Sequence, residues 1–228
     1  MSQFEFKPLR YRQRWFCYLD LLGFTDLVHN NDIANVMPIY GDVLATLKNA
    51  TPRIKPGRII FSWFSDTFIL YSGGHSAQDF ARIESVGRVF FERLIIRGVP
   101  VRGALTYGGL YSQSARNIFV GPALIDAYRY AENQDWLGFI LTPRAIVRME
   151  EIGLPIEERP FYRQVNAAGI FKHPDTAPVY GFAFNNGLLN GQNLYQKSLE
   201  TMREKAGPRY SNKYDKTLAF LHAAQARK

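Results

Sequence analysis

The sequence predicts an α+β sandwich in which helices cover one face of a mostly antiparallel sheet, close to the ferredoxin-like layout. Two observations support this prediction. Short segments rich in β-branched and aromatic residues alternate with longer segments whose apolar residues recur at helical spacing. The order that results is strand, helix, two paired strands, helix, strand, helix, strand.

The first strand covers residues 14–22, an almost continuous apolar run. Residues 26–48 follow with apolar side chains at helical spacing, so they predict one helix. Prolines and a glycine within residues 49–57 end that helix.

Residues 58–72 predict a hairpin, because both halves are aromatic and β-branched. The two strands meet in a tight turn around Ser65 and Asp66. Ser76 then stands where a helix cap is expected, before a helix that runs to about Ile96.

The second half of the chain repeats the alternation. Residues 99–112 predict a strand rich in Val and Thr that bends at Gly108 and Gly109. Residues 121–133 predict a helix with Pro122 in its first turn. Four further elements follow: a strand over 137–142, an amphipathic piece over 143–150, a strand over 177–184, and a charged, helical tail from Leu194.

Length and charge restrict the class of protein. A chain of 228 residues is long enough for one domain with appendages and a sizeable core. It has no apolar run near the ~20 residues of a membrane helix, and its N-terminus lacks a signal peptide, so we expect a cytoplasmic protein. The net charge of +8 indicates an anionic partner: nucleic acid, a membrane surface or a phosphorylated small molecule.

Two aspartates stand where the predicted sheet would bring them together. Asp20 ends the first strand, and a buried carboxylate is costly unless something pairs with it. Asp66 lies in the turn of the hairpin, which a ferredoxin-like sheet places beside that strand. Two like charges there favour a hard divalent cation held by carboxylate and carbonyl oxygens. Either aspartate alone is also explained as a turn or capping residue.

The segment that follows Asp20 offers a second kind of site. It enters a helix directly, so its free backbone amides, with the helix dipole behind them, would suit a phosphate.

Four motifs resemble those of class III nucleotide cyclases, in the order that the family has them. "YLDLLGFT" resembles the first metal-binding signature, and "FSDTFIL" stands where the second metal aspartate lies. "VRGALTYGG" resembles the strand whose arginine contacts triphosphate, and "GPALIDAYRYA" the helix whose arginine stabilises the transition state. These motifs cover residues 14–142, and "GIFKHPDTAPVYGF" is a weaker match to a later strand pair with a phosphate-binding lysine.

The resemblance implies a class III cyclase sandwich and a domain organisation. Residues 1–13 would be an N-terminal extension, 14–190 the catalytic domain and 191–228 a helical C-terminal tail. It also implies a head-to-tail homodimer with two sites at its interface, because the family's transition-state arginine reaches metals of the other subunit.

The resemblance further implies a two-metal phosphoryl transfer with Mn²⁺ or Mg²⁺. Each implied role falls on residues of this chain: Asp20, Asp66 and the Leu21 carbonyl for the two ions; Leu22, Gly23, Phe24, Thr25, Arg102 and Lys172 for the triphosphate; Arg129 for the transition state. Each of the three basic side chains named here also has a structural explanation. Arg102 would then be a structural bridge, Lys172 a surface lysine, and Arg129 a salt-bridge partner of Glu132 or Asp126.

The departures from the family indicate a different base. The purine-reading positions fall on Ser62 and Ile118, and an isoleucine offers no hydrogen bond to a base edge. The ribose-orienting asparagine falls on Ile125, and the bulky Trp63 and Phe64 suggest a narrow base pocket. These features resemble the bacterial pyrimidine cyclases of Pycsar antiphage defence, which make cyclic UMP or cyclic CMP.

This resemblance implies UTP, more than CTP, as substrate. It also implies a separate effector that senses the cyclic nucleotide, and neither a membrane nor a stably bound nucleic acid as partner. Two alternatives stay open: an adenylate or guanylate cyclase with atypical base contacts, and a non-catalytic, basic ferredoxin-like module that binds nucleic acid.

Overall fold

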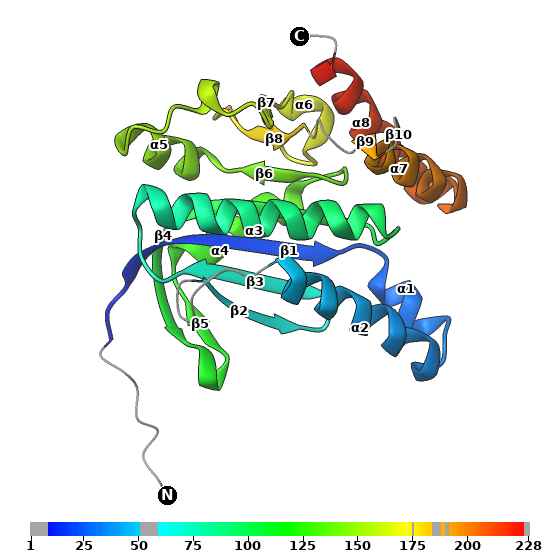
Figure 1. The fold of residues 1–228 in the computed structure, drawn as a ribbon, viewed down its shortest axis with the longest axis horizontal. Helices are drawn as coiled ribbons and strands as arrows, with labels where there is room; N and C mark the ends of the chain where they lie inside the picture. The colour runs from blue at the N-terminus through cyan, green and yellow to red at the C-terminus, as the bar shows by residue number, and fades with distance from the viewer. Residues whose placement is uncertain (1–8, 51–58, 175, 184–187, 190–191, 226–228) are drawn as a thin grey trace, which may run out of the picture.

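The computed structural model describes residues 9–50, 59–174, 176–183, 188–189 and 192–225. Its main sheet has the order β2-β3-β1-β4-β6-β8-β7, from bottom to top of Figure 1, and β5 also pairs with β4. Neighbouring strands are antiparallel except β4 and β6, which are parallel. The predicted α+β fold with a large, mostly antiparallel sheet is therefore confirmed.

The elements agree well with the expected order. The strands are β1 (Arg12–Leu21), β2 (Ile59–Phe64), β3 (Thr67–Ser72), β4 (Val101–Gln113), β5 (Ile118–Val120), β6 (Phe139–Leu141), β7 (Tyr162–Gln164), β8 (Tyr180–Phe182), β9 (Leu188–Leu189) and β10 (Gln192–Asn193). The α-helices are α1 (Phe24–His29), α2 (Ile33–Ala50), α3 (Ala77–Ile96), α4 (Pro122–Asn133), α5 (Pro143–Glu151), α6 (Ala167–Ile170), α7 (Leu194–Lys205) and α8 (Pro208–Gln225). Two 3₁₀ turns, Ser114–Arg116 and Ile156–Glu158, complete the described chain.

Helices cover both faces of the sheet, which corrects the expectation of helices on one face. The side chains of Trp15, Cys17 and Leu19 point to the face that α2, α3 and α7 cover. Phe16 and Tyr18 alternate with them and face α4 and α6. Helix α4 can lie close to the strands because Ala123, Ala127 and Ala131 form a stripe of small residues along its inner side.

Three other expectations can be compared with the structure. Ser76 caps α3 as predicted, in a capping box with Asp79. The helix predicted over 26–48 is instead two helices, α1 and α2, because Asn30, Asn31 and Asp32 favour a turn between them. Strand β4 continues without interruption through Gly108 and Gly109, where we expected a bend. Three predicted features lie mostly or wholly outside the described residues. These are the break over 49–57, residues 1–8 of the N-terminal extension, and the domain boundary between residues 190 and 191.

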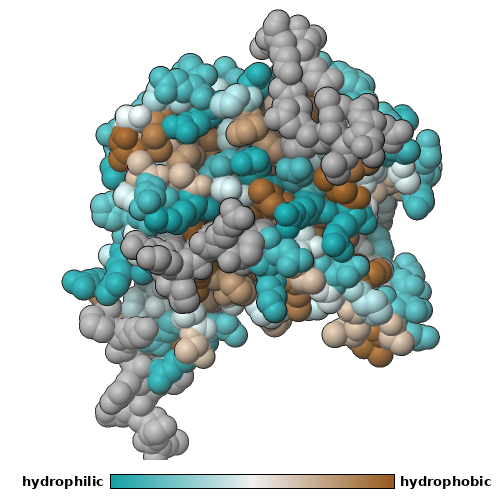
Figure 2. Space-filling model, viewed as in Figure 1, coloured by the Kyte–Doolittle hydropathy of each residue, from teal (hydrophilic) through white to brown (hydrophobic). Residues whose placement is uncertain are grey.

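The C-terminal helices pack on the domain. Helix α7 lies against α3, where the Ser198 hydroxyl donates to the Ile95 carbonyl at 2.6 Å, and α8 packs on α7 (Figure 1). In the described part of the chain, each helix is too short or too polar to cross a bilayer. Exposed apolar side chains gather on α1 and the start of α2, at the lower right of Figure 2, where Val28, Ile33 and Met37 reach solvent.

Candidate active site

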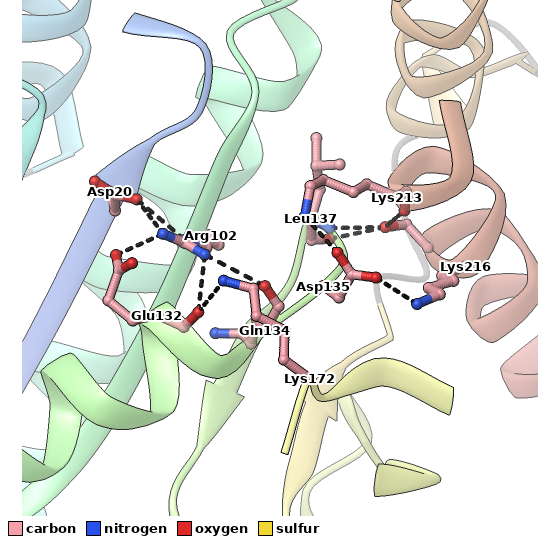
Figure 3. Close-up of polar contacts among 10 residues, drawn as sticks. Asp20, Arg102, Glu132, Gln134, Asp135, Leu137, Lys172, Lys213 and Lys216 are labelled. Atoms are coloured by element: carbon pink, nitrogen blue, oxygen red, sulfur yellow. Dashed lines mark hydrogen bonds and ion pairs between the residues drawn. The ribbon is translucent and has the colours of Figure 1, made fainter. Parts of the chain in front are cut away.

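Asp20 lies at the end of β1 and has a cationic partner in the neighbouring strand. The register of β1 and β4 sets Asp20 opposite Arg102, and their side chains meet on the α4 face of the sheet. Both Nε and Nη2 of Arg102 donate to Oδ2 of Asp20, at 3.0 and 2.9 Å (Figure 3). The buried carboxylate is thus paired with a guanidinium, a bidentate-donor arrangement that arginine favours.

The rest of the Arg102 guanidinium binds the end of α4 and the loop after it. Nη1 donates to the carbonyls of Glu132 and Gln134, at 3.1 and 3.3 Å, and Nη2 also donates to the Glu132 carboxylate. All five N–H donors of this buried side chain are therefore engaged within the protein. Arg102 therefore forms the contacts of the structural-bridge alternative, and its triphosphate contact stays a prediction.

The loop that receives Arg102 is itself held on both sides. The buried Gln134 side chain donates to the Gly103 carbonyl at 3.0 Å. On the other side, Lys213 and Lys216 of α8 form ion pairs with Asp135 (Figure 3). The Thr217 hydroxyl also accepts the Leu137 amide at 2.9 Å.

The surroundings of Asp20 disfavour its charged form. Burial raises the pKa of Asp20 to about 6, Arg102 opposes this shift, and the nearby carboxylates of Glu132 and Asp66 add to it. The influence of Asp66 on this pKa indicates that the two carboxylates that we predicted to converge share one electrostatic environment.

The raised pKa of Asp20 predicts a pH-dependent stability. The folded protein holds this proton more tightly than the unfolded chain between about pH 4 and pH 6, because the pKa rises from 3.8 to about 6. The contribution of the group to the free energy of unfolding is therefore present below pH 4 and is lost as pH rises through 6. Urea titrations from pH 4 to 7 should show the wild type losing on the order of 2 kcal/mol relative to Asp20→Asn. Parallel curves for the two proteins would contradict the assignment.

Asp66 reaches the same end of the sheet from the β2–β3 turn, which forms around Ser65 and Asp66 as predicted. Ser65 adopts a left-handed conformation there, with φ of 54°. The Leu21 amide donates to the Asp66 carbonyl at 3.0 Å, so this turn is joined to the end of β1. Within the described residues, the Asp66 carboxylate forms no hydrogen bond or ion pair, unlike that of Asp20.

The turn after β1 only partly matches the predicted phosphate cradle. The Leu22 amide donates to the Pro100 carbonyl at 2.8 Å, so it is not available to a phosphate. Gly23 begins α1 in a left-handed conformation, with φ of 73°, and both Gly23 and Thr25 are exposed while Phe24 is half-buried.

The oxygen atoms at this end of the sheet fit a hard divalent cation. The Asp66 carboxylate and Oδ1 of Asp20 accept no hydrogen bond from the described residues, and burial, with smaller contributions from Glu132 and Asp66, raises the pKa of Asp20. Carboxylate and carbonyl oxygens are the ligands that Mg²⁺ and Mn²⁺ prefer. Clusters of three or more acidic, His or Cys residues are not found in the described chain, so the Leu21 carbonyl and substrate oxygens would complete such a site.

Arg129 and Lys172 line one pocket of about 680 Å³, beside the ion pairs of Arg102 with Asp20 and Glu132. The exposed Arg129 comes from α4, and Lys172 from the segment after α6. Glu132 lines the same pocket and joins it to Arg102, and the Lys172 ammonium donates to the Glu132 carbonyl at 2.7 Å. Partial burial, together with the charges of Arg102 and Lys213, lowers the pKa of Lys172.

The two predicted base-reading positions also lie together. The Ser62 hydroxyl, on β2, donates to the Asn117 side-chain oxygen at 3.0 Å, and Asn117 directly precedes Ile118 of β5. The edge of β2 also presents Phe61 and Trp63, whose rings are stacked with centroids 6.1 Å apart. A polar amide therefore stands next to Ile118, whose own side chain offers no hydrogen bond.

Sequence reasoning missed Asn117, Glu132 and Gln134 as members of the site. Glu132 and Gln134 interact with a strand some thirty residues earlier, so local patterning cannot reveal their contacts. A signal for Asn117 was present, because asparagine commonly adopts the left-handed conformation with φ of 52° seen here.

With this geometry, the chain has the fold of class III nucleotide cyclase catalytic domains. The adenylyl cyclase CyaB from P. aeruginosa is similar with a TM-score of 0.58 at 12% identity, covering 81% of this chain and all of that one. The guanylate cyclase domain of RhGC from Catenaria anguillulae, in complex with GTP, has a TM-score of 0.58 at 12% identity and covers 76% and 97%. At such identities the similarity concerns the fold. Protein-family models and curated protein sequences give no match.

Proposed function

We propose that the protein is a nucleotide cyclase that converts UTP, or less readily CTP, into the 3′,5′-cyclic monophosphate and pyrophosphate. The observation that carries this proposal is that Asp20 and Asp66 lie at one end of the sheet, where the Leu21 amide donates to the Asp66 carbonyl, near the pocket lined by Arg129 and Lys172. The fold adds support, because the solved structures that resemble the chain are adenylyl and guanylyl cyclase domains.

In the proposed reaction the ribose 3′-oxygen forms a bond to the α-phosphorus, the bond from that phosphorus to the pyrophosphate oxygen breaks, and the hydroxyl proton leaves to solvent. Two divalent ions would supply the charge that makes the hydroxyl more acidic and neutralises the pyrophosphate. Asp20, Asp66 and the Leu21 carbonyl would hold these ions. Arg102 would orient the Asp20 carboxylate, as a positioning residue rather than a triphosphate ligand.

The remaining polar groups would bind the substrate. Arg129 would meet the charge that develops on the α-phosphoryl oxygens, a contribution of several kcal/mol when donors are preorganised. Lys172 lies in the same pocket and would add positive charge at the triphosphate. Gly23, Phe24 and the Thr25 hydroxyl remain as candidates for phosphate contacts at the start of α1.

The proposal includes a homodimer whose two sites lie at the interface. Apolar side chains are exposed on the outer side of α4, where Ile125 and Tyr128 flank Arg129, and on β2, where Phe64 is 84% exposed. Exposed apolar groups that accumulate in this way are typical of surfaces that bind another protein. A second copy covering them would bring Arg129 of one protomer to the aspartates of its partner.

The pyrimidine preference rests on the base-reading positions. Ile118 offers no polar group, while Asn117, fixed by Ser62, has an amide nitrogen left to donate to a base carbonyl. Such a donor matches O4 of uracil. In this proposal the product is a second messenger of antiviral defence, which a separate effector reads.

Incubation of the protein with each of the four labelled NTPs and Mn²⁺ tests the reaction and its specificity together. We expect cyclic UMP as the main product, with less cyclic CMP, and a loss of the preference for UTP in Asn117→Ala of about 1–3 kcal/mol, the cost of leaving a polar group unpaired.

The outcomes of this assay separate the three readings of the sequence. A purine cyclic nucleotide would overturn the pyrimidine proposal and leave the cyclase proposal standing. The absence of any cyclic product would overturn the enzyme proposal and favour the non-catalytic module.

A further inference from the structure

Three arginines line a pocket at the other end of β1. Arg12 and Arg14 occupy alternate positions of this strand, so they lie on the same face of the sheet, and Arg10 precedes them. The pocket has a volume of about 240 Å³. Its other lining residues are Ile60, Tyr71, Leu110, Tyr111, Ser112 and Ser114, so no carboxylate of the described chain lines it.

Arg14 is the buried member of this arginine pocket. Its side chain is 8% exposed, one Nη donates to the Ser72 carbonyl, and the guanidinium lies 5.3 Å from the centre of the Tyr71 ring. Its Nε is buried and has no hydrogen-bond partner among the residues that the structure describes. A charged donor that is buried without a partner is costly, and native proteins rarely retain one without a ligand, water or ion to bind.

The electrostatic environment adds to this cost. Burial lowers the pKa of Arg14, and the positive charge of Arg12 lowers it further, against the opposing influence of Tyr71. Within the described chain, none of the three arginines of the pocket forms an ion pair. The three cations therefore lie together, and within the described residues no carboxylate pairs with them to offset their repulsion.

The arginine pocket is separate from the candidate active site. Arg14 and Asp20 are about 20 Å apart along β1, at about 3.3 Å per residue. None of the residues that line the arginine pocket lines the pocket of Arg129 and Lys172. An anion bound to these arginines would therefore leave the carboxylate pair free.

We propose that the arginine pocket binds a small phosphate-type oxyanion. Guanidinium groups match the oxygens of phosphate in a planar, two-donor geometry, and serine hydroxyls lie within the same pocket to complete the contacts. The volume is below the roughly 300 Å³ at which pockets for whole organic ligands begin. Free phosphate, pyrophosphate and the terminal phosphates of a nucleotide share this chemistry.

Calorimetry on the full chain in EDTA tests the proposal, because active-site binding that depends on divalent ions is then silent. Sodium phosphate, sodium pyrophosphate and UTP are titrated in separate arms. We expect pyrophosphate to bind, and Arg12→Gln to weaken that binding by about tenfold or more, the scale of one charge-assisted contact. Arg12 is exposed, so its replacement preserves the fold.

Two control variants locate the effect. Arg93→Gln removes an exposed arginine of α3, and Arg129→Gln removes one cation of the candidate active site; neither should change pyrophosphate binding in EDTA. Equal affinity for UTP and pyrophosphate would assign the site to free phosphate chains. Tighter binding of UTP that survives Arg129→Gln would assign it to nucleotides. Both results support the proposal.

The proposal is overturned if none of the three probes binds, or if Arg12→Gln binds as the wild type does. A single-stranded RNA oligomer is titrated in a fourth arm, and binding of this probe alone also overturns the proposal, because the pocket would then be part of a larger nucleic-acid surface. These results do not depend on turnover, so the proposal can fail while the cyclase assay succeeds.

Discussion

Replacing Asp66 with asparagine is expected to abolish nucleotide cyclisation while leaving the fold intact. The Asp66 carboxylate forms no hydrogen bond or ion pair within the described chain, so its charge contributes little to stability. It is a proposed ligand of both divalent ions, and its loss should lower turnover by about 10³-fold, the scale of removing one preorganised electrostatic group. Cyclic nucleotide formation with Mn²⁺, measured beside urea unfolding, gives both quantities.

A matched variant separates the role of Asp66 from a general effect of charge. Asp42→Asn removes an exposed carboxylate of α2 and should leave turnover unchanged. Binding of Mn²⁺, followed by its paramagnetic resonance signal, should weaken in Asp66→Asn and not in Asp42→Asn. Full turnover in Asp66→Asn would disprove the metal assignment, whatever the substrate is.

Replacing Arg102 with methionine is expected to have the largest effect on stability. The change leaves the buried Asp20 carboxylate and the Glu132 carboxylate without their shared partner, together with two carbonyls that it contacts. Breaking a buried pair by removing one partner costs about 3–5 kcal/mol. The free energy of unfolding in urea measures this cost, and Arg93→Met serves as an exposed control.

A second substitution tests the reason for the loss. Combining Arg102→Met with Asp20→Asn removes the unpaired charge, so the double variant should be more stable than Arg102→Met alone. Arg102→Lys keeps the charge but has three donors in place of five, and should fall between wild type and methionine. A cost below about 1 kcal/mol for Arg102→Met would show that Arg102 is not the partner that Asp20 requires.

The sequence predicted those parts of the fold that depend on local chemistry. The cap at Ser76 and the tight turn at Ser65 and Asp66 could be read from residue type and spacing. The residues Asn30 to Asp32 also indicate the break between α1 and α2. The helical spacing of apolar residues on both sides of them nevertheless led to the prediction of one helix.

Features that depend on packing were out of reach of the sequence. The stripe of alanines in α4 indicates a close contact without saying which face of the sheet receives it. The partner of Asp20 was not predictable either. Arg102 could reach solvent, phosphate or a carboxylate, and the choice depends on Glu132 and Gln134, which the fold brings from another element. The proximity of Asp66 to Asp20 could be predicted, because it depends only on the order of the strands in the sheet.

The ion pairs of Lys213 and Lys216 with Asp135 have a consequence for how the protein matures. These ion pairs hold the loop in which the Gln134 carbonyl accepts a hydrogen bond from Arg102. They therefore connect α8 to the end of β1 that carries Asp20. A nascent chain that has not yet released α8 from the ribosome lacks this clamp. Formation of α8 therefore completes the support of a buried carboxylate, Asp20, that lies far earlier in the chain.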